Sequence, residues 1–509
     1  MVNKKGRGLF VSAVLISTLM VLSKVSGFVR EAVIAGYFGA SLGTDLFFLS
    51  SGVMGGIFMA VGTALASIFL PIYSEKLINQ GREEASNFTS KTISFFFPAA
   101  IMITIIILII SPQIAKVSAP SYHNGQLQDL ISFIRIISIS FIFFIGMYIF
   151  SSILNAEKNF LPPQLTGLIY SSTIILSIIF VSKHLGIMSL IYAYPVSYLL
   201  QMVIMWLWSR PFFKFHLVVH AWDDDVKNLL ILMTPALLGN SLEQINQLIA
   251  RVIASGLQIG SVSALSYAQV LYGFGTAIFV ISFTTILFTT FSEYTAIGSL
   301  DLLKSEVRDS LSILTVILVP ISLISVLFSY DIISIVYQRG SFDQNAVALT
   351  KNAFMFLALG FVFFGIREVL TRAFYALKDS KTPMLNGIIA VFINIILSFM
   401  LASFLGIGGI ALGMVISLFI TSVLLILALR RKLGCLGLSS FAVTCAKILV
   451  ATIPTILIAC KCKVFLASLS PFVRLPLATV VILIVYIAIL YLVKCKELNL
   501  MISAIKVSK

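Results

Sequence analysis

The sequence predicts an all-α polytopic membrane protein with about fourteen transmembrane helices, and three observations support this fold class. Hydrophobic residues make up 59% of the 509 residues and charged residues only 11%, a balance that soluble globular domains do not have. Apolar runs of about 20 residues, the length of a membrane-spanning helix, recur along the whole chain. Short motifs also recur at a nearly constant offset, which predicts two parallel-repeated six-helix lobes followed by two C-terminal helices.

Each predicted span is an apolar run that ends at a short polar segment or at a break containing Gly or Pro. In chain order, the fourteen predicted spans are residues 9–37, 46–73, 92–118, 128–154, 161–182, 186–208, 228–257, 264–291, 307–329, 350–376, 383–405, 407–429, 441–460 and 473–493. We expect their ends to be accurate to within several residues.

The first span has two interpretations. Lys4, Lys5 and Arg7 precede an apolar stretch, as they do in a cleaved signal peptide. No small-residue cleavage site of the Ala-x-Ala type follows, and the apolar run continues past Arg30 to Phe38. We therefore expect a retained membrane span.

The distribution of Lys and Arg predicts the orientation of the chain. If the N-terminus is cytoplasmic, 22 of the 35 Lys and Arg residues fall in inner segments and 7 in outer segments. Lys and Arg concentrate in cytoplasmic loops, so both termini are predicted to be cytoplasmic. Much of the net charge of +15 then reflects membrane topology, and we expect no nucleic-acid partner.

An internal repeat is the main sign of domain organisation. Three motif pairs carry it: Val33-Ile34-Ala35 with Val252-Ile253-Ala254, Tyr73-Ser74-Glu75 with Phe291-Ser292-Glu293, and Ala156-Glu157-Lys158-Asn159 (with Pro163) with Ala376-Leu377-Lys378-Asp379 (with Pro383). The pairs occur in sequence order at nearly identical offsets, and these offsets map six spans onto six spans. An even number of spans makes the repeats parallel, as in transporters that rock two halves around a central site.

The repeat divides the chain into four predicted parts. They are an N-terminal six-helix lobe (1–209), a cytoplasmic linker (210–227), a C-terminal six-helix lobe (228–432), and two additional transmembrane helices with a cytoplasmic tail (433–509). A cleft between the two lobes is the expected consequence.

Charged residues inside the predicted first span indicate a binding cavity. Lys24, Arg30 and Glu31 lie in an apolar run, where each charge costs about 2.5–3.5 kcal/mol on insertion scales. Such charges face a wet or paired interior, so we expect them to line a cavity for a charged ligand. On an ideal helix Lys24 and Glu31 lie within about 20° of one face and Arg30 about 120° away. A bend at Gly27 would bring all three together, and a structural Lys24–Glu31 bridge is the alternative.

Four other intramembrane charges are candidates for the same cavity. Glu243 and Arg251 lie in the predicted seventh span, and Arg367 and Glu368 in the tenth. Arg251 and Arg367 are predicted to bind substrate, and Glu243 or Glu368 to couple transport to a proton or a monovalent cation. The alternative for Arg367 and Glu368 is mutual neutralisation. Arg135 and Lys447 are expected to snorkel or to pair locally.

Three segments resemble one family. The run SKVSGFVREAVIAGYFGASLGTDLFF (23–48), the motif Gly260-Ser261-Val262-Ser263-Ala264 and the tract from Arg367 to Pro383, which contains Ala-Leu-Lys-Asp-Ser-Lys-Thr-Pro, resemble the MurJ (MviN) family of lipid II flippases. That family belongs to a larger superfamily with multidrug and polysaccharide exporters. The resemblance implies fourteen helices and the export of an undecaprenyl-diphosphate-linked sugar across a bacterial plasma membrane.

The resemblance also implies roles for single residues. Lys24 stands where the family usually has a cavity arginine, Arg30 matches a second such arginine, Glu31 an acidic neighbour, and Asp45 an acidic residue at the entry to the second span. Two positions depart from the family: its arginine pair in the second span is replaced by Gly55-Gly56-Ile57-Phe58, and its Asp-Arg pair in the eighth by Tyr267-Ala268-Gln269-Val270-Leu271.

The leading functional prediction is a lipid II flippase that works by alternating access, with the head group in the cleft and the isoprenoid tail in lipid or along the two added helices. A flippase for another polyprenyl-linked glycan, such as a capsule or teichoic-type precursor, is the first alternative. A small-molecule drug exporter would have an acidic or aromatic cavity. A membrane glycosyltransferase would need catalytic acids on a large outer loop, and residues 116–129 contain one carboxylate.

Other chemistry has no motif in the sequence. There is no G-x-x-x-x-G-K-[ST] loop, so we expect no ATP hydrolysis. Of the four histidines, only His216 and His220 lie close together, without a metal-site pattern. The five cysteines all lie in the C-terminal part of the chain, from Cys435 to Cys495, and are expected to be free thiols. We therefore predict no catalytic residue, metal or cofactor, and a monomer in the bilayer.

Overall fold

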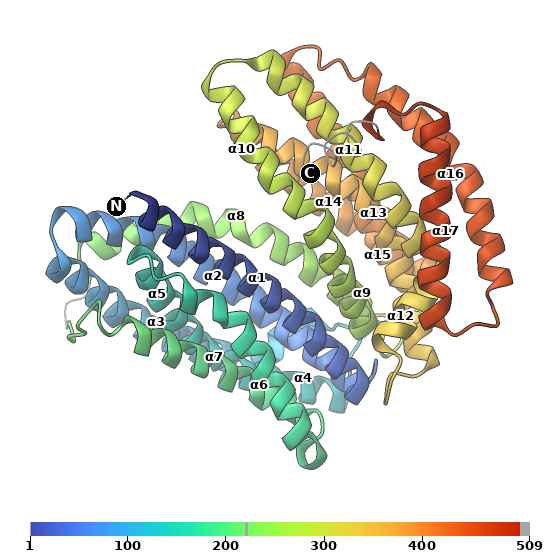
Figure 1. Cartoon of the computed structure of the whole chain (residues 1–509). Helices are drawn as coiled ribbons and strands as arrows, with labels where there is room; N and C mark the ends of the chain where they lie inside the picture. The colour runs from blue at the N-terminus through green and yellow to red at the C-terminus, as the bar shows by residue number, and fades with distance from the viewer. Residues whose placement is uncertain (1, 219–221, 499–509) are drawn as a thin grey trace. The chain divides into compact units, whose positions relative to one another are not determined.

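The computed structural model describes residues 2–218 and 222–498, with the side chains of 2–17, 238–240, 242 and 243 left out. The described residues form seventeen α-helices and one π-helix, and they contain no strand (Figure 1). The predicted all-α class is therefore confirmed. The chain packs as two compact units, Met1–Ser263 and Ala264–Lys509.

The first unit contains eight helices and the start of a ninth. They are α1 (Val2–Phe38), α2 (Leu42–Asn79), α3 (Arg82–Ser118), α4 (Asn124–Ser138), α5 (Ser140–Ala156), α6 (Leu161–Leu185), α7 (Met188–Ser209), α8 (Asp224–Ser255) and α9, which begins at Ser261 and ends at Thr276. Helix α2 packs against α3, α4, α5 and α8, while α1 packs against α6. Phe58 of α2 is fully buried and stacks on Phe141 with ring centroids 5.1 Å apart.

The second unit contains the remaining helices. They are the π-helix η1 (Ala277–Ile281), α10 (Ser282–Ala296), α11 (Leu300–Leu327), α12 (Ser329–Tyr337), α13 (Gln344–Ala376), α14 (Lys381–Leu405), α15 (Ile407–Leu433), α16 (Ser439–Phe465) and α17 (Pro471–Leu492). Gly409 and Gly413 of α15 lie against the backbone of α14, where a Cβ would overlap Leu401 and Ser398. Small residues allow such close contact between membrane helices.

The sequence repeat is visible as repeated backbone geometry. Helices α6 and α14 both have 25 residues, and each ends at a glycine with positive φ, Gly186 at 54° and Gly406 at 56°. Each also follows a lysine with positive φ, Lys158 at 60° and Lys378 at 57°. Non-glycine residues seldom adopt this conformation, so its recurrence at the matching position of the second motif supports the predicted repeat.

Twelve segments of the described chain are long and apolar enough to cross a membrane. The fourteen predicted spans include these twelve and the two charged helices α1 and α8, which have 37 and 32 residues but do not meet the same criterion. The fourth predicted span is divided at Ile139 into α4 and α5, and η1 interrupts the eighth. The pattern of apolar residues in the sequence does not indicate either of these local breaks.

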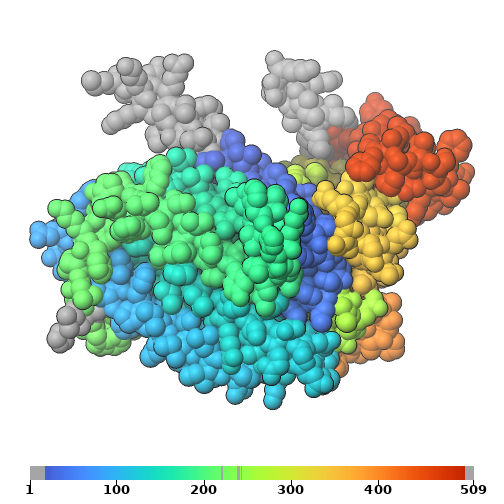
Figure 2. Space-filling view, turned by 90° about the horizontal axis from the view of Figure 1, so that it is seen from below, coloured from blue at the N-terminus to red at the C-terminus, as the bar shows by residue number. Residues whose placement is uncertain are grey.

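Large apolar side chains cover the outer surfaces of the helices. Phe180 of α6 is 71% exposed and Phe404 of α14 is 82% exposed. In the space-filling view α6 and α7 of the first unit lie at the surface, in shades of green (Figure 2). Such faces suit contact with lipid acyl chains, which form the solvent of a membrane protein.

The packing boundary differs from the predicted boundary of the lobes. Helix α8 begins the second repeat, yet it packs against α2 and α3 within the first unit. The four-part division at residues 209, 227 and 432 stays a prediction, and so does the cleft between the lobes.

Candidate functional site

A polar cluster in the first unit is built around Arg30 and Glu31 of α1. The Arg30 Nε and Nη2 atoms donate to Glu31 Oε1 at 3.1 and 2.6 Å. The Arg30 side chain is 18% exposed and that of Glu31 6%. Glu31 Oε2 is buried and has no hydrogen-bond partner among the described residues. The pair therefore lies in the interior of the unit, and Glu31 Oε2 is still able to accept a hydrogen bond.

Aromatic rings from α6 and α7 form the wall beside Arg30. The guanidinium carbon of Arg30 lies 4.6 Å from the centroid of the Tyr170 ring, within the range of a cation–π contact. Tyr170 packs against Tyr194 and Tyr198, at centroid distances of 5.8 and 5.7 Å. These three tyrosines are not distinguished in the sequence, where their only signal is an aromatic side chain on an apolar helix.

A second arginine reaches the same region from α8. Arg251 Nη1 donates to the Phe48 carbonyl oxygen of α2 at 3.2 Å. Gly52 makes room for it, since a Cβ at that position would lie 2.9 Å from the Arg251 Cζ atom. Arg251 Nε is buried without a partner among the described residues, and Arg251 interacts electrostatically with Glu31. The structure thus brings together three of the predicted residues, Arg30, Glu31 and Arg251.

Lys24 and Asp45 lie outside this cluster. Lys24 is exposed on α1, which continues as a helix through Gly27, and it forms no ion pair with any described carboxylate. The alternative of a Lys24–Glu31 bridge is not what the structure shows, because Arg30 takes the carboxylate. Asp45 is 1% exposed and accepts hydrogen bonds from the backbone N–H groups of Gly260 and Ser263 at 2.6 and 2.7 Å.

Asp45 has a clear structural role, and its predicted role in substrate binding stays a prediction. The Ser263 hydroxyl also donates to its Oδ1 atom. A carboxylate suits the N-terminus of a helix, where backbone N–H groups lack partners, and here it caps α9. Both carboxylate oxygens are therefore occupied in this structure.

The remaining predicted residues belong to other surroundings. Arg367 is half-buried on α13 and forms no ion pair with a described residue, while Glu368 pairs with Arg372, with 3.9 Å between Oε2 and Nε. Mutual neutralisation of Arg367 and Glu368 is therefore not observed. The Glu243 side chain lies outside the described residues. Their roles in substrate binding and ion coupling stay predictions.

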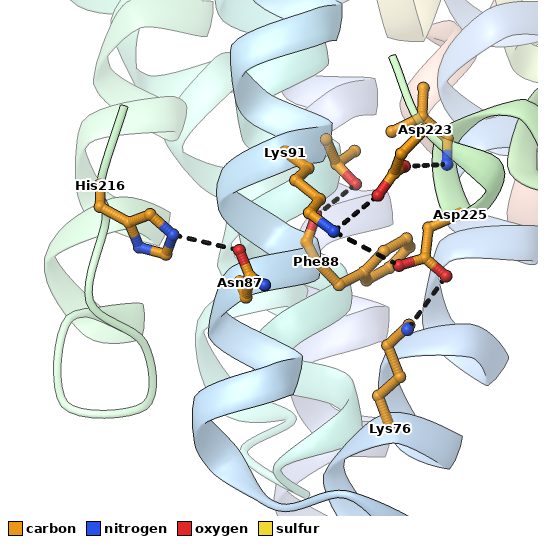
Figure 3. A network of polar contacts seen from close by, with 9 residues as sticks. Lys76, Asn87, Phe88, Lys91, His216, Asp223 and Asp225 are labelled. Atoms are coloured by element: carbon orange, nitrogen blue, oxygen red, sulfur yellow. Dashed lines mark hydrogen bonds and ion pairs between the residues drawn. The ribbon is translucent and has the colours of Figure 1, made fainter. Parts of the chain in front are cut away.

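The predicted linker is bound along α3. His216 lies between Ser90 and Asn87, with Nδ1 3.2 Å from Ser90 Oγ and Nε2 3.2 Å from Asn87 Oδ1. Lys91 donates to Asp223 at 2.6 Å, and Figure 3 shows this contact beside the one between His216 and Asn87. The linker is therefore held to α3 through the side chains of His216 and Asp223.

Asp223, which belongs to this network, is the N-cap residue of α8. Asp223 Oδ1 accepts from the backbone N–H of Val226 at 3.1 Å, which caps the helix as predicted for the aspartate run. Burial opposes ionisation of Asp223, but the hydrogen bonds from Lys91 and Val226 outweigh it and lower its pKa. Asp225 pairs with Lys76 at 3.0 Å (Figure 3).

Metal-site geometry is absent from the described part of the chain. No cluster of three or more His, Cys, Asp or Glu side chains with the geometry of a metal site occurs there. His220 lies outside the described residues. The five cysteines are free thiols.

An apolar groove of about 440 Å³ lies in the second unit, between α11 and α17. Its lining is almost entirely hydrocarbon and includes Ile317, Pro320, Leu483 and Tyr486. Pro320 has no N–H to donate to the carbonyl four residues earlier. That carbonyl, of Val316, instead accepts from the Tyr486 hydroxyl at 3.2 Å.

Within the second unit, a largely buried ion pair joins α17 to α12. Arg474 at the start of α17 binds both oxygens of Asp331 in α12, with Nε 3.1 Å from Oδ2. The Asp331 side chain is 3% exposed. The wall of the groove is thus anchored at one end of α17.

Comparisons with known proteins agree with the resemblance seen in the sequence. A family model described as "Lipid II flippase MurJ" matches residues 34–495. A protein of Rickettsia prowazekii described as "Probable lipid II flippase MurJ" is 30% identical over 412 residues, which are 80% of each chain. A protein of Borreliella burgdorferi with the same description is 27% identical over 419 residues, 81% of each chain.

Solved structures share the fold. "Lipid II flippase MurJ, inward closed conformation" superposes with a TM-score of 0.80 at 23% identity, over 94% of this chain and 99% of that one. An inward-facing multidrug resistance MATE transporter of the MOP superfamily gives a TM-score of 0.69 at 14% identity, over 84% of this chain and 99% of that one. Because the family model spans most of the sequence, the chain belongs to the lipid II flippase MurJ family.

Proposed function

We propose that the protein translocates lipid II, an undecaprenyl-diphosphate-linked peptidoglycan precursor, from the inner to the outer leaflet of the bacterial plasma membrane by alternating access. The observation that carries this proposal is the Arg30–Glu31–Arg251 cluster, with a buried Glu31 and two half-buried arginines, in a chain of the lipid II flippase family. Two arginines and one carboxylate leave an excess of positive charge, which suits a diphosphate.

Arg30 is the residue that we propose to contact the diphosphate first. Its Nε and Nη2 atoms are bonded to Glu31, while Nη1 has no hydrogen bond to any described residue. A planar guanidinium makes paired, charge-assisted hydrogen bonds to phosphate oxygens. Arg251 contributes a second cation through its unpaired Nε, and Lys24 and Arg367 are the further cations proposed.

The apolar groove is proposed to hold part of the isoprenoid tail. Its volume of about 440 Å³ is in the range of small-molecule pockets and is too small for a complete undecaprenyl chain. Most of the tail would therefore stay in lipid. A hydrocarbon lining gives such a tail favourable burial without requiring polar partners.

Several properties belong to the same proposal. Both termini face the cytoplasm, as the Lys and Arg distribution favours. The protein acts as a monomeric transporter and catalyses no covalent reaction, and Glu243 or Glu368 couples transport to a proton or a monovalent cation. A different polyprenyl-linked glycan is the second candidate substrate, favoured by the glycines at positions 55 and 56 where the family has cations.

The test uses cells that depend on this protein for growth after loss of their own lipid II flippase. Arg30→Ala should abolish the accumulation of externally accessible lipid II while the membrane level of the protein stays normal. Arg135→Ala is the matched control, because Arg135 is an exposed arginine of α4 that only bonds Ser111. Normal translocation by the Arg30 variant would contradict the proposal, and failure of the unmodified protein to support growth would point to another glycan.

A further inference from the structure

The orientation of the Arg30 guanidinium depends on a group outside α1. Both hydrogen bonds from Arg30 end on the same atom, Glu31 Oε1, so the Glu31 contact alone does not fix the plane of the guanidinium. The Tyr170 ring of α6 covers one face of the guanidinium at 4.6 Å. The Tyr170 ring covers a face of the Arg30 guanidinium, and the Glu31 carboxylate binds its Nε–Nη2 edge. Together these two contacts fix the direction of the remaining edge of the guanidinium, which carries Nη1.

The ring itself is packed against two other tyrosine rings. Tyr170 meets Tyr194 nearly edge to face, with an interplanar angle of 87°, and Tyr198 at 41°. Tyr194 and Tyr198 pack on each other with centroids 5.2 Å apart. One turn before Tyr170, Gly167 lets α6 approach Ser23 of α1 closely, since a Cβ there would overlap the Ser23 hydroxyl. The close contact between Gly167 and the Ser23 side chain therefore helps to set the position of the ring relative to α1.

Direct sugar stacking on these rings is a different use of the same residues, and the geometry does not favour it. Tyr194 is only 4% exposed, and the guanidinium covers one face of Tyr170. Tyr194 therefore offers almost no free surface to a pyranose, and one face of Tyr170 is already occupied by Arg30.

We propose that Tyr170 is a positioning residue, which holds the Arg30 guanidinium so that its Nη1 edge is presented to an anionic group of the substrate. This inference rests on the proposed function, because Arg30 must bind the diphosphate for its orientation to matter. Preorganisation of this kind lowers the cost of ordering a long side chain when the ligand binds.

The experiment measures the affinity of the full-length protein in lipid nanodiscs for undecaprenyl diphosphate, a probe that carries the diphosphate without the sugar. Tyr170→Phe keeps the aromatic face and should bind within about twofold of the parent. Tyr170→Leu removes it and should weaken binding about five- to thirty-fold, the range of a partly desolvated cation–π contact. Tyr192→Leu is the control, because Tyr192 is 48% exposed on α7.

Two further measurements separate positioning from packing. In an Arg30→Ala background, Tyr170→Leu should have no additional effect on affinity. A series of fluorinated phenylalanines at position 170, which keeps the ring shape while weakening its negative face, should lower affinity stepwise. This series also decides the matter if the leucine variant does not fold.

The outcomes distinguish the inference from the function. Equal weakening by Tyr170→Leu with and without Arg30, or a flat fluorination series, would overturn the positioning role and leave the flippase proposal intact. If Arg30→Ala alone leaves the affinity for undecaprenyl diphosphate unchanged, the head-group role of Arg30 fails, and the positioning role fails with it.

Discussion

Replacement of Gly52 by alanine is the sharpest test of the arrangement around Arg251. A Cβ on residue 52 would overlap Arg251 Nη1 and would lie 2.9 Å from Cζ and 3.2 Å from Cδ. The Nη1 and Cζ atoms must therefore move away from the surface of α2, which displaces the guanidinium from its present position.

Two opposing contributions set the size of the effect. The displaced arginine loses its hydrogen bond to the Phe48 carbonyl, which is worth about 1.5–3 kcal/mol for a charged donor. Alanine gains about 1 kcal/mol over glycine inside a helix. Gly52→Ala should therefore lower the free energy of unfolding by about 0.5–2 kcal/mol, and it should reduce translocation by more than this stability loss explains.

The assay compares thermal unfolding midpoints in detergent and translocation in cells. Gly55→Ala is the matched control on the same helix, because its Cβ would meet only the Tyr194 hydroxyl, at 3.5 Å. In an Arg251→Ala background the overlap is gone, so adding Gly52→Ala should raise the midpoint. Equal stability and activity of the Gly52 and Gly55 variants would show that Arg251 does not occupy the space beside Gly52.

Three other variants test contacts elsewhere. Asp379→Asn weakens the contact with Lys432, an exposed pair worth about 0.5–1 kcal/mol. Hydrogen bonds from Lys432 and a backbone N–H lower the Asp379 pKa to about 2, so the stabilisation by this pair is complete above about pH 4 and is lost towards pH 2. The thermal unfolding midpoints of parent and variant should therefore converge at low pH. Tyr486→Phe leaves the Val316 carbonyl unpaired and should cost about 1–3 kcal/mol, measured by thermal unfolding; an unchanged midpoint would contradict it. Arg474→Leu leaves a buried carboxylate unpaired and should cost about 3–5 kcal/mol, seen as faster hydrogen exchange in α16 and α17; parent-like exchange would argue against the anchor.

The spans could be predicted from the sequence because hydrocarbon imposes a length and an apolar composition on each helix. The repeat could also be predicted, because its motifs match in the sequence. Within these matching motifs Lys158 and Lys378 adopt the same unusual conformation. The break at Ile139 and the π-helix at 277–281 were not, because hydrogen-bond register inside an apolar helix leaves the residue pattern unchanged.

The sequence was expected to gather Lys24, Arg30 and Glu31 in one place, but the structure brings only Arg30 and Glu31 together and leaves Lys24 exposed on α1. Helical spacing also allowed a Lys24–Glu31 bridge as the alternative, whereas the long side chain of Arg30 reaches its neighbour and lies against Tyr170. The place of Arg251 beside Gly52 depends on a contact between two helices that are far apart in the sequence. Spacing along one helix carries no information about such contacts.

The position of α8 has a consequence for the order in which the protein is made. Because α8 packs on α2 within the first unit, that unit is incomplete until synthesis has passed Ser263, and the surface around Gly52 lacks its arginine until then. Domains generally fold from the N-terminus as they emerge, yet here the first six spans must wait in the bilayer for a helix of the second repeat. A gene divided at the repeat boundary would therefore yield a first fragment without the helix that completes its charged cluster.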